Sequence, residues 1–157
     1  MSSDLFFKFL LLFLPLQLLA LDTPEPDVAR SYGVEYISAK DAKALHDAKS
    51  ATFCDARITR EFITETIPDA LSCMYEEKGG RENKRADFDP SIEEWHSQNI
   101  VDKNRTLVIF CNAKNCWRSY KAAFVAKEMG FRDVRWLRDG VPAWRSAGYE
   151  LENNCPL

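Results

Sequence analysis

Short apolar runs bounded by polar residues recur along the chain, and they predict β-strands. The clearest is TLVIF at 106–110, a continuous apolar run of the kind expected in a central parallel strand covered on both faces. Further strands are predicted at 34–37, 51–57, 71–75 and 131–137. The chain therefore contains enough strands for one central sheet.

Segments with an apolar residue every three or four positions lie between these strands and predict helices. In SYKAAFVAKEMG, Ala122, Val125, Ala126 and Met129 share one helical face, and Gly130 is a natural C-terminal stop. Shorter helical segments are predicted at 39–49, 58–67, 91–99 and 139–148. The repeated order of strand, helix and strand predicts an α/β fold with a mostly parallel central sheet and helices on both faces.

The N-terminus differs from the rest of the chain. Residues 9–21 read FLLLFLPLQLLAL, an apolar stretch shorter than the roughly 20 residues that span a membrane. It resembles the core of a secretory signal peptide with cleavage after Ala20, and an uncleaved membrane anchor is the alternative. Export would place the protein in the periplasm or outside the cell. The expected segments are a signal peptide at 1–20, a linker at 21–33, one domain at 34–152 and a tail at 153–157.

Charge and histidine content limit the classes of partner. The 157 residues include 21 basic and 24 acidic side chains, which give a net charge of −3. A mildly acidic chain without a basic stripe argues against nucleic acid as the main partner, but it allows small anions at a local basic spot. The two histidines, His46 and His96, are far in sequence from the closely spaced cysteines, so a structural zinc site is not expected.

The segment FCNAKNCWRS at 110–119 concentrates the candidate chemistry. Cys111 ends the strand at 106–110, and sites form at the carboxyl ends of strands in open α/β sheets. Backbone N–H groups at the following helix start attract negative charge, and Lys114 and Arg118 add to this effect. A Cys111 thiolate would be stabilised there, which predicts a nucleophile. The alternative is a cysteine that acts only as a small buried hydrophobic residue.

The remaining cysteines leave several interpretations open. Cys116 could close a disulfide with Cys111, resolve a persulfide or sulfenate, or serve only in packing. Cysteines of exported proteins are usually paired, and five of them leave at least one free or bonded to another molecule. Cys54 and Cys73 are expected to be core thiols, which can form a disulfide only if their strands lie side by side. Cys155 is the candidate for intermolecular pairing.

From Phe110 onward the chain resembles a single-domain rhodanese, a sulfurtransferase. Shared features are an aromatic–cysteine pair at a strand end, a cationic loop, Arg-Ser opening a helix and a glycine turn ending in Ala-Trp. They correspond here to Phe110-Cys111, Arg118-Ser119, Ala122-Ala123, Gly130-Phe131, Val134, Leu137, Gly140 and Ala143-Trp144. Upstream, CDARITREF resembles the family's Asp-x-Arg-x-x-x-Glu-Phe element, and TIPDA resembles its His-Ile-Pro-Gly-Ala turn. The resemblance covers roughly residues 34–150.

The cysteine loop is longer than is usual in that family. Rhodaneses place four residues between the cysteine and the arginine, and related phosphatases place five, whereas residues 112–117 make six here. The Cys-x4-Cys-Trp pattern from Cys111 to Trp117 is similar to that of a subgroup of exported bacterial rhodanese-like proteins, some linked by their names to quinoprotein-dependent catabolism. The resemblance therefore implies an exported rhodanese-like domain at 34–152.

The resemblance also implies a mechanism. The Cys111 thiolate would attack the outer sulfur of a donor anion such as thiosulfate, and a thiophilic acceptor, cyanide in an assay or a thiol in the cell, would remove the sulfur. No metal or organic cofactor is implied, and a periplasmic redox or sulfur-acceptor protein is a possible partner. Asp55 and Arg57 are expected to form an ion pair that supports the loop. Substrate binding is implied for the loop residues Asn112, Ala113, Lys114, Asn115, Cys116, Trp117 and Arg118.

Two functions of other classes compete with sulfur transfer. A thiol–disulfide redox protein would cycle Cys111 and Cys116 between dithiol and disulfide. A non-catalytic binding module would keep the fold and use the loop to hold a partner or an anion. The cations beside Cys111 favour anion or persulfide chemistry, whereas an oxidising compartment favours the disulfide.

Overall fold

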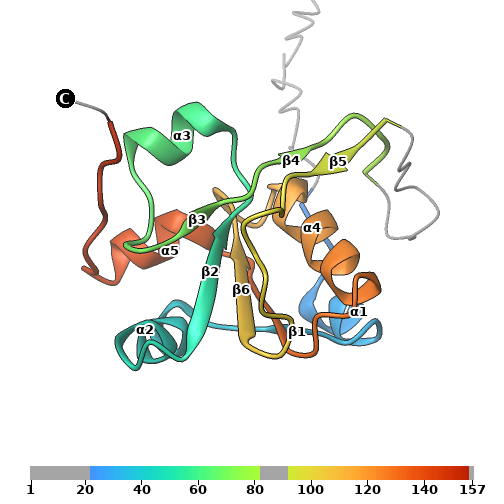
Figure 1. The fold of residues 1–157 in the computed structure, drawn as a ribbon, viewed down its shortest axis with the longest axis horizontal. Helices are drawn as coiled ribbons and strands as arrows, with labels where there is room; N and C mark the ends of the chain where they lie inside the picture. The colour runs from blue at the N-terminus through green and yellow to red at the C-terminus, as the bar shows by residue number, and fades with distance from the viewer. Residues whose placement is uncertain (1–21, 82–91, 156–157) are drawn as a thin grey trace, which may run out of the picture.

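A five-stranded, all-parallel sheet lies at the centre of the protein (Figure 1). The computed structural model describes residues 22–81 and 92–155, so the signal peptide expected at 1–20 lies outside these ranges. The strands of this sheet are β1 (Val34–Tyr36), β2 (Ala51–Asp55), β3 (Leu71–Ser72), β6 (Thr106–Phe110) and β7 (Val134–Leu137). Their order across the sheet is β1-β7-β6-β2-β3, which makes β6 the central strand.

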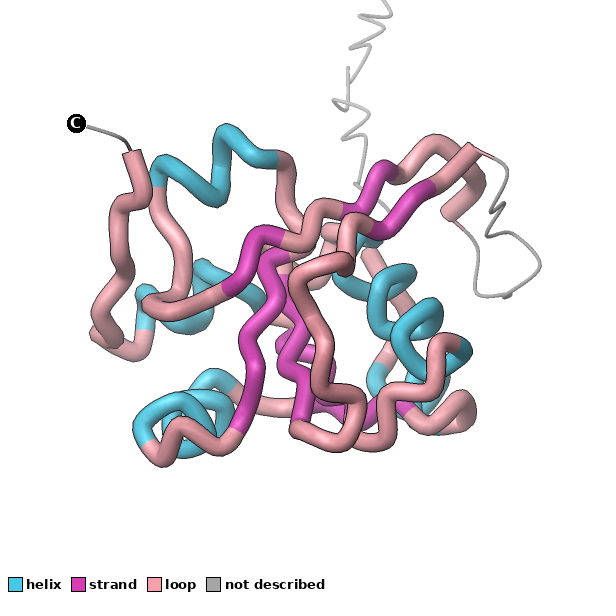
Figure 2. The backbone as a smooth tube through the Cα atoms, viewed as in Figure 1, coloured by secondary structure: helices cyan, strands magenta, loops and turns pink. Residues whose placement is uncertain are grey.

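Helices cover both faces of this sheet (Figure 2). On one face, Leu107 and Ile109 of β6 pack with α1 (Pro26–Arg30) and α4 (Trp117–Glu128). On the other face, Val108 and Phe110 pack with α2 (Ala39–Asp47) and α5 (Gly140–Ser146). The remaining helix, α3 (Thr59–Thr64), follows β2. Alternate side chains of β6 thus enter two separate cores, which is why this strand is apolar throughout.

The predicted α/β architecture is confirmed, and most element positions agree with it. At the start of α2, the Ser38 side chain accepts a hydrogen bond from the Asp41 amide and so caps the helix. The strand predicted at 71–75 is divided between β3 and β4 (Tyr75–Glu76). Of the face predicted for α4, Ala122 and Ala126 are buried, whereas Met129 is exposed at the C-terminal cap.

The helix predicted over 91–99 is wrong. Within that range, β5 (Glu94–Trp95) pairs with β4 in an antiparallel hairpin. The Trp95 side chain is buried in the α4-side core, and its indole N–H donates to the Cys73 carbonyl at 3.1 Å. This long-range contact outweighs the local helical signal of the segment.

The segment at 21–33, predicted as a linker, is part of the folded unit from Asp22 onward. It contains α1, whose Ala29 is fully buried, and Thr23 is also buried. No helix within residues 22–81 and 92–155 is long and apolar enough to cross a membrane.

A buried ion pair fastens the β4–β5 hairpin to α4. The Lys121 ammonium lies 2.5 Å from a Glu93 carboxylate oxygen, and both side chains are almost completely buried. The same carboxylate accepts hydrogen bonds from the Tyr75 hydroxyl and from the amides of Lys78 and Gly79. Burial raises the pKa of Glu93, but these donors outweigh burial, so the pKa is lowered overall.

Replacing Glu93 should destabilise the protein strongly. We expect Glu93→Gln to lower the free energy of unfolding by about 3–5 kcal/mol, because the buried Lys121 ammonium loses the negative charge of its Glu93 partner. The neighbouring Glu94 side chain is exposed, and Glu94→Gln should change the value by less than about 0.5 kcal/mol. Urea denaturation with the disulfides intact measures both. Equal effects of the two variants would contradict the assignment.

The contribution of Glu93 should depend on pH in a defined direction. A carboxylate with a lowered pKa in the folded state stabilises above its unfolded pKa, roughly 4.3, and loses this effect as the pH falls through the folded value. The difference in unfolding free energy between wild type and Glu93→Gln should therefore be constant near neutral pH and shrink below about pH 4. A difference that grows on acidification would show that the pKa is raised instead.

Candidate functional site

The candidate site is the loop between β6 and α4, at the carboxyl end of the central strand. Cys111 directly follows β6 and is 1% exposed. Cys116 is the N-terminal cap residue of α4 and is 9% exposed. The loop begins the crossover from β6 through α4 to β7 and lies at the carboxyl edge of the sheet, where sites of α/β proteins form.

The two loop cysteines form a disulfide. Their Cα atoms are 6.1 Å apart, and a hydrogen bond of 2.8 Å from the Cys116 amide to the Ala113 carbonyl closes the turn between them. A second disulfide joins Cys54 to Cys73, which is possible because β2 and β3 are adjacent parallel strands. The sequence left the Cys111–Cys116 and Cys54–Cys73 pairings open, and both disulfides are present in the structure. Cys155 is an exposed free thiol, and its intermolecular pairing stays a prediction.

The start of α5 packs directly against the cysteine. The Val141 amide donates a hydrogen bond of 3.0 Å to the Cys111 carbonyl. Gly140 has φ +58°, and a Cβ atom at this position would collide with the Cys111 carbonyl and lie 2.8 Å from the Asn112 carbonyl oxygen. Only glycine combines this backbone conformation with such a close approach, so Gly140 fixes the path of the loop.

The ion pair of Asp55 and Arg57 braces the loop from the neighbouring strand. The Arg57 guanidinium lies 2.7 Å from the Asp55 carboxylate, and both side chains are buried. Asp55 also accepts a hydrogen bond from the Thr66 hydroxyl, and Arg57 donates to the Glu65 carbonyl. A weaker hydrogen bond of 3.4 Å joins Arg57 to the Asn112 side chain. The pair thus connects three chain segments, one of which is the cysteine loop.

A strap formed by residues 22–25 covers the middle of the loop. The buried Thr23 donates from both its amide and its hydroxyl to the Lys114 carbonyl. The Arg138 guanidinium, at the end of β7, donates to the Thr23 carbonyl at 2.9 Å and pairs with Glu25 at 3.1 Å. The Lys114 ammonium pairs with Asp22 at 2.9 Å, so its charge is shared with the strap.

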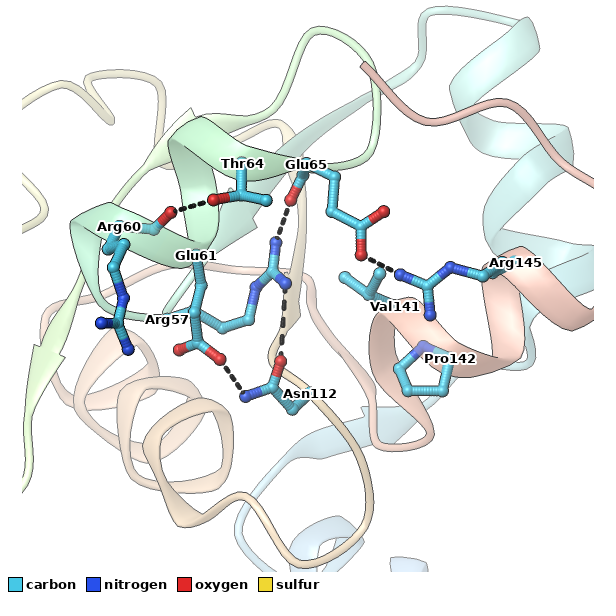
Figure 3. Close-up of a pocket in the computed structure, with 9 residues that line it drawn as sticks. All are labelled: Arg57, Arg60, Glu61, Thr64, Glu65, Asn112, Val141, Pro142 and Arg145. Carbon is cyan, nitrogen blue, oxygen red and sulfur yellow. Dashed lines mark hydrogen bonds and ion pairs between the residues drawn. The ribbon is translucent and has the colours of Figure 1, made fainter. Parts of the chain in front are cut away.

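A pocket of about 290 Å³ opens beside the loop (Figure 3). Its walls come from α3, α5 and the loop: Arg57, Arg60, Glu61, Thr64, Glu65, Asn112, Val141, Pro142 and Arg145. Asn112 donates a hydrogen bond of 2.7 Å to Glu61, and Arg145 pairs with Glu65. Arg60 is exposed and makes no ion pair with any residue that the structure describes. The pocket therefore retains one guanidinium that an anion can bind.

The other predicted loop residues are divided between surface and core. Lys114 and Asn115 are exposed and Ala113 is half-buried. Trp117 is buried and packs edge-to-face on Tyr120, so it belongs to the core and not to the pocket. Burial in the same core raises the pKa of Tyr120 to about 12.

Arg118 and the loop amides remain open to an anion. Arg118 is half-buried in the first turn of α4 and forms no ion pair within the described ranges. In the same ranges, no carbonyl accepts a hydrogen bond from the amides of residues 112–115. Backbone N–H groups and a guanidinium without partners are donors that an anion can bind. Of the predicted substrate-binding residues, only Asn112 also lines the pocket.

Sequence reasoning missed Arg60, Arg145, Thr23 and Arg138. Thr23 and Arg138 act through hydrogen bonds between residues that are 91 and 115 positions apart in the sequence. Arg60 and Arg145 line the pocket only because one particular face of their short helices lies beside the loop. No local pattern signals such contacts.

The profile of the rhodanese-like domain matches residues 38–147, which is more than half of the chain. The chain belongs to the rhodanese-like domain family. No curated protein matches its sequence. The matched residues include both disulfides, the cysteine loop and α5, whereas the strap at 22–25 precedes them.

Solved structures share this rhodanese-like fold. A protein from Bacillus halodurans is 17% identical with a TM-score of 0.57, over 76% of this chain and 77% of that one. A protein of unknown function from Rhodopseudomonas palustris, described as a possible tyrosine phosphatase, is 29% identical with a TM-score of 0.55, over 80% and 89%. A thiosulfate sulfurtransferase from Pseudomonas aeruginosa is 22% identical with a TM-score of 0.52, over 83% of this chain but only 23% of that one.

Substituting Gly140 should displace the loop. Gly140→Ala introduces a Cβ atom that collides with backbone atoms of Cys111 and Asn112, which cannot move aside like a flexible side chain. Gly148 has φ +76° but nothing within 4 Å of the same Cβ position. We expect Gly148→Ala to cost only the backbone strain of about 1–2 kcal/mol, and Gly140→Ala to cost clearly more. Equal losses in urea denaturation would contradict the close packing of α5 on the loop.

Proposed function

We propose that this rhodanese-like protein is an exported sulfurtransferase that carries a sulfane sulfur on Cys111. The observation that carries the proposal is the position of Cys111, at the carboxyl end of the central strand and at the start of the loop that leads into α4, in a chain of this family. The two disulfides support an oxidising compartment and therefore export, with residues 1–20 as a signal peptide. Periplasmic thiol proteins would be natural partners.

The proposed reaction begins once the disulfide of the loop has been reduced. The Cys111 thiolate attacks the outer sulfur of a donor such as thiosulfate, the Cys111 Sγ–sulfur bond forms, and the bond to sulfite breaks. Sulfite leaves with the electron pair. A thiophilic acceptor, cyanide or a thiolate, then attacks the outer sulfur of the persulfide and releases Cys111 as a thiolate. No net oxidation occurs in either step.

The electrostatics of the loop support an anionic intermediate. The amides of residues 112–115 lack carbonyl partners within the described chain, and Arg118 has no acidic partner there. A persulfide anion or a thiosulfate bound beside these groups gains charge-assisted hydrogen bonds, and a thiolate at the start of α4 gains from the helix N-terminus. The loop therefore stabilises both the nucleophile and the product.

The persulfide can be tested by intact mass and peptide mapping. The reduced protein, mixed with thiosulfate, should release sulfite, and in Cys116→Ser the transferred sulfur atom should stay on Cys111 until cyanide removes it. Cys111→Ser should gain none. Cys155→Ser is the matched control, because Cys155 is an exposed thiol far from the loop in sequence, and this variant should behave like wild type. Sulfur on Cys155 alone, or uptake by Cys111→Ser, would overturn the assignment.

The pocket beside the loop should influence the binding of an anionic donor. We expect Arg60→Ala to raise KM for thiosulfate several-fold with little change in kcat, because an exposed guanidinium contributes binding about equally to ground state and transition state. Arg132 is a suitable control, since it is also exposed but lies before β7, at the opposite end of the strands. A fall in kcat with unchanged KM would show that Arg60 acts elsewhere in the reaction.

A thiol–disulfide redox function is the second candidate, and the Cys111–Cys116 disulfide is the observation that favours it. Such a protein needs the two thiols but not the anion-binding groups. Arg118→Ala should therefore reduce sulfur uptake from thiosulfate and leave the rate of disulfide exchange with a small dithiol unchanged. Disulfide exchange by the wild type without any sulfur uptake would favour the redox function.

A further inference from the structure

The neighbouring thiol raises the question of where the sulfur goes. We propose that Cys116 ends each turnover by attacking the Sγ atom of the Cys111 persulfide, which releases sulfide and closes the disulfide of the loop. This inference rests on the proposed sulfur transfer. It makes Cys116 a catalytic residue and makes the protein a thiosulfate-dependent source of sulfide, driven by an external dithiol.

The geometry of the loop places the two sulfur atoms within bonding reach. The Cα atoms of Cys111 and Cys116 are 6.1 Å apart, inside the usual range for a disulfide. Two hydrogen bonds hold the turn between them. The Cys116 amide donates to the Ala113 carbonyl, and the Thr23 amide donates to the Lys114 carbonyl. A loop fixed at these points keeps the Cys116 thiol beside Cys111 after the bond is broken.

Burial favours this internal attack over attack by a large external acceptor. In the disulfide form, Cys111 is 1% exposed, so an acceptor protein has almost no surface by which to approach it. An internal thiol in the right position acts at an effective concentration far above that of any dissolved thiol. The persulfide on Cys111 should therefore react with Cys116 before a protein thiol reaches it.

The step balances in atoms and electrons. The bond between Cys116 Sγ and Cys111 Sγ forms, and the bond between Cys111 Sγ and the outer sulfur breaks. The outer sulfur takes the electron pair and leaves as hydrosulfide with the proton of the Cys116 thiol. The two cysteine sulfurs are oxidised by two electrons in total, and the sulfane sulfur is reduced by two.

Each further turnover then requires reduction of the disulfide by a dithiol. Cys116 is 9% exposed and Cys111 1%, so the thiolate of the reductant should attack Cys116 Sγ. Cys111 leaves as the thiolate, beside the N-cap residue of α4, where the helix N-terminus stabilises the negative charge. The second thiol of the reductant then attacks its own sulfur in the mixed disulfide and frees Cys116. This order regenerates the nucleophile.

A single-turnover experiment with the full-length protein separates the steps. The reduced wild type, freed of reductant, is mixed with one equivalent of thiosulfate, and sulfide, sulfite and protein mass are followed. We expect sulfite and then sulfide to appear, and Cys111 and Cys116 to become cross-linked. Cys116→Ser should release sulfite, keep the extra sulfur on Cys111, and form sulfide at least about tenfold more slowly. Cys155→Ser should match wild type.

The outcomes distinguish this inference from the proposed function. A wild-type persulfide that persists beside a reduced Cys116, or sulfide release from Cys116→Ser at the wild-type rate, would overturn the inference and leave sulfur transfer intact. Absence of sulfur uptake in wild type and in Cys116→Ser would overturn the proposed function itself. Peptide mapping should show that the Cys54–Cys73 disulfide stays intact throughout, so that the change in mass can be assigned to Cys111 and Cys116.

Discussion

The site depends most on the buried carboxylate of Asp55. A charge in the interior of a protein is tolerated only when it is paired and its remaining oxygens accept hydrogen bonds. Arg57 and Thr66 supply those partners, and Arg57 in turn holds the Glu65 carbonyl and Asn112. The end of β2, the segment after α3 and the cysteine loop are therefore fixed relative to one another. A shift of any one would leave a buried charge without its partners.

The loop is held on its other sides through backbone carbonyls. Val141 donates to the Cys111 carbonyl, and Thr23 donates to the Lys114 carbonyl. These contacts constrain the path of the chain whatever the loop side chains are. The loop is two residues longer than the usual rhodanese loop, and the strap at residues 22–25 holds it in the middle through the Lys114 carbonyl.

The sequence predicted those features that depend on local periodicity. Continuous apolar runs located β2 and β6, and the spacing of apolar residues located α4, because both faces of a parallel sheet must be covered. The hairpin of β4 and β5 was not predicted, since Trp95 is drawn into the core by contacts with a distant part of the chain. The position of Cys111 at a strand end followed from the sequence. Its closure with Cys116 was one of several open interpretations, because the spacing of two cysteines does not determine the distance between their Cβ atoms.

The two disulfides have different physical settings, and this difference bears on the chemistry of the loop. Cys54 and Cys73 lie in the core beneath the β4–β5 hairpin, where a reducing thiolate has no approach. Cys116 retains exposed surface at the start of α4. Because thiol–disulfide exchange requires an attacking thiolate to reach a sulfur atom, a mild dithiol should open the loop pair while the core pair stays closed. A protein that must cycle one cysteine pair in an oxidising compartment needs this separation. Loss of the core disulfide would loosen β3 from β2, and a displaced β2 would shift the Asp55 carboxylate on which the loop depends.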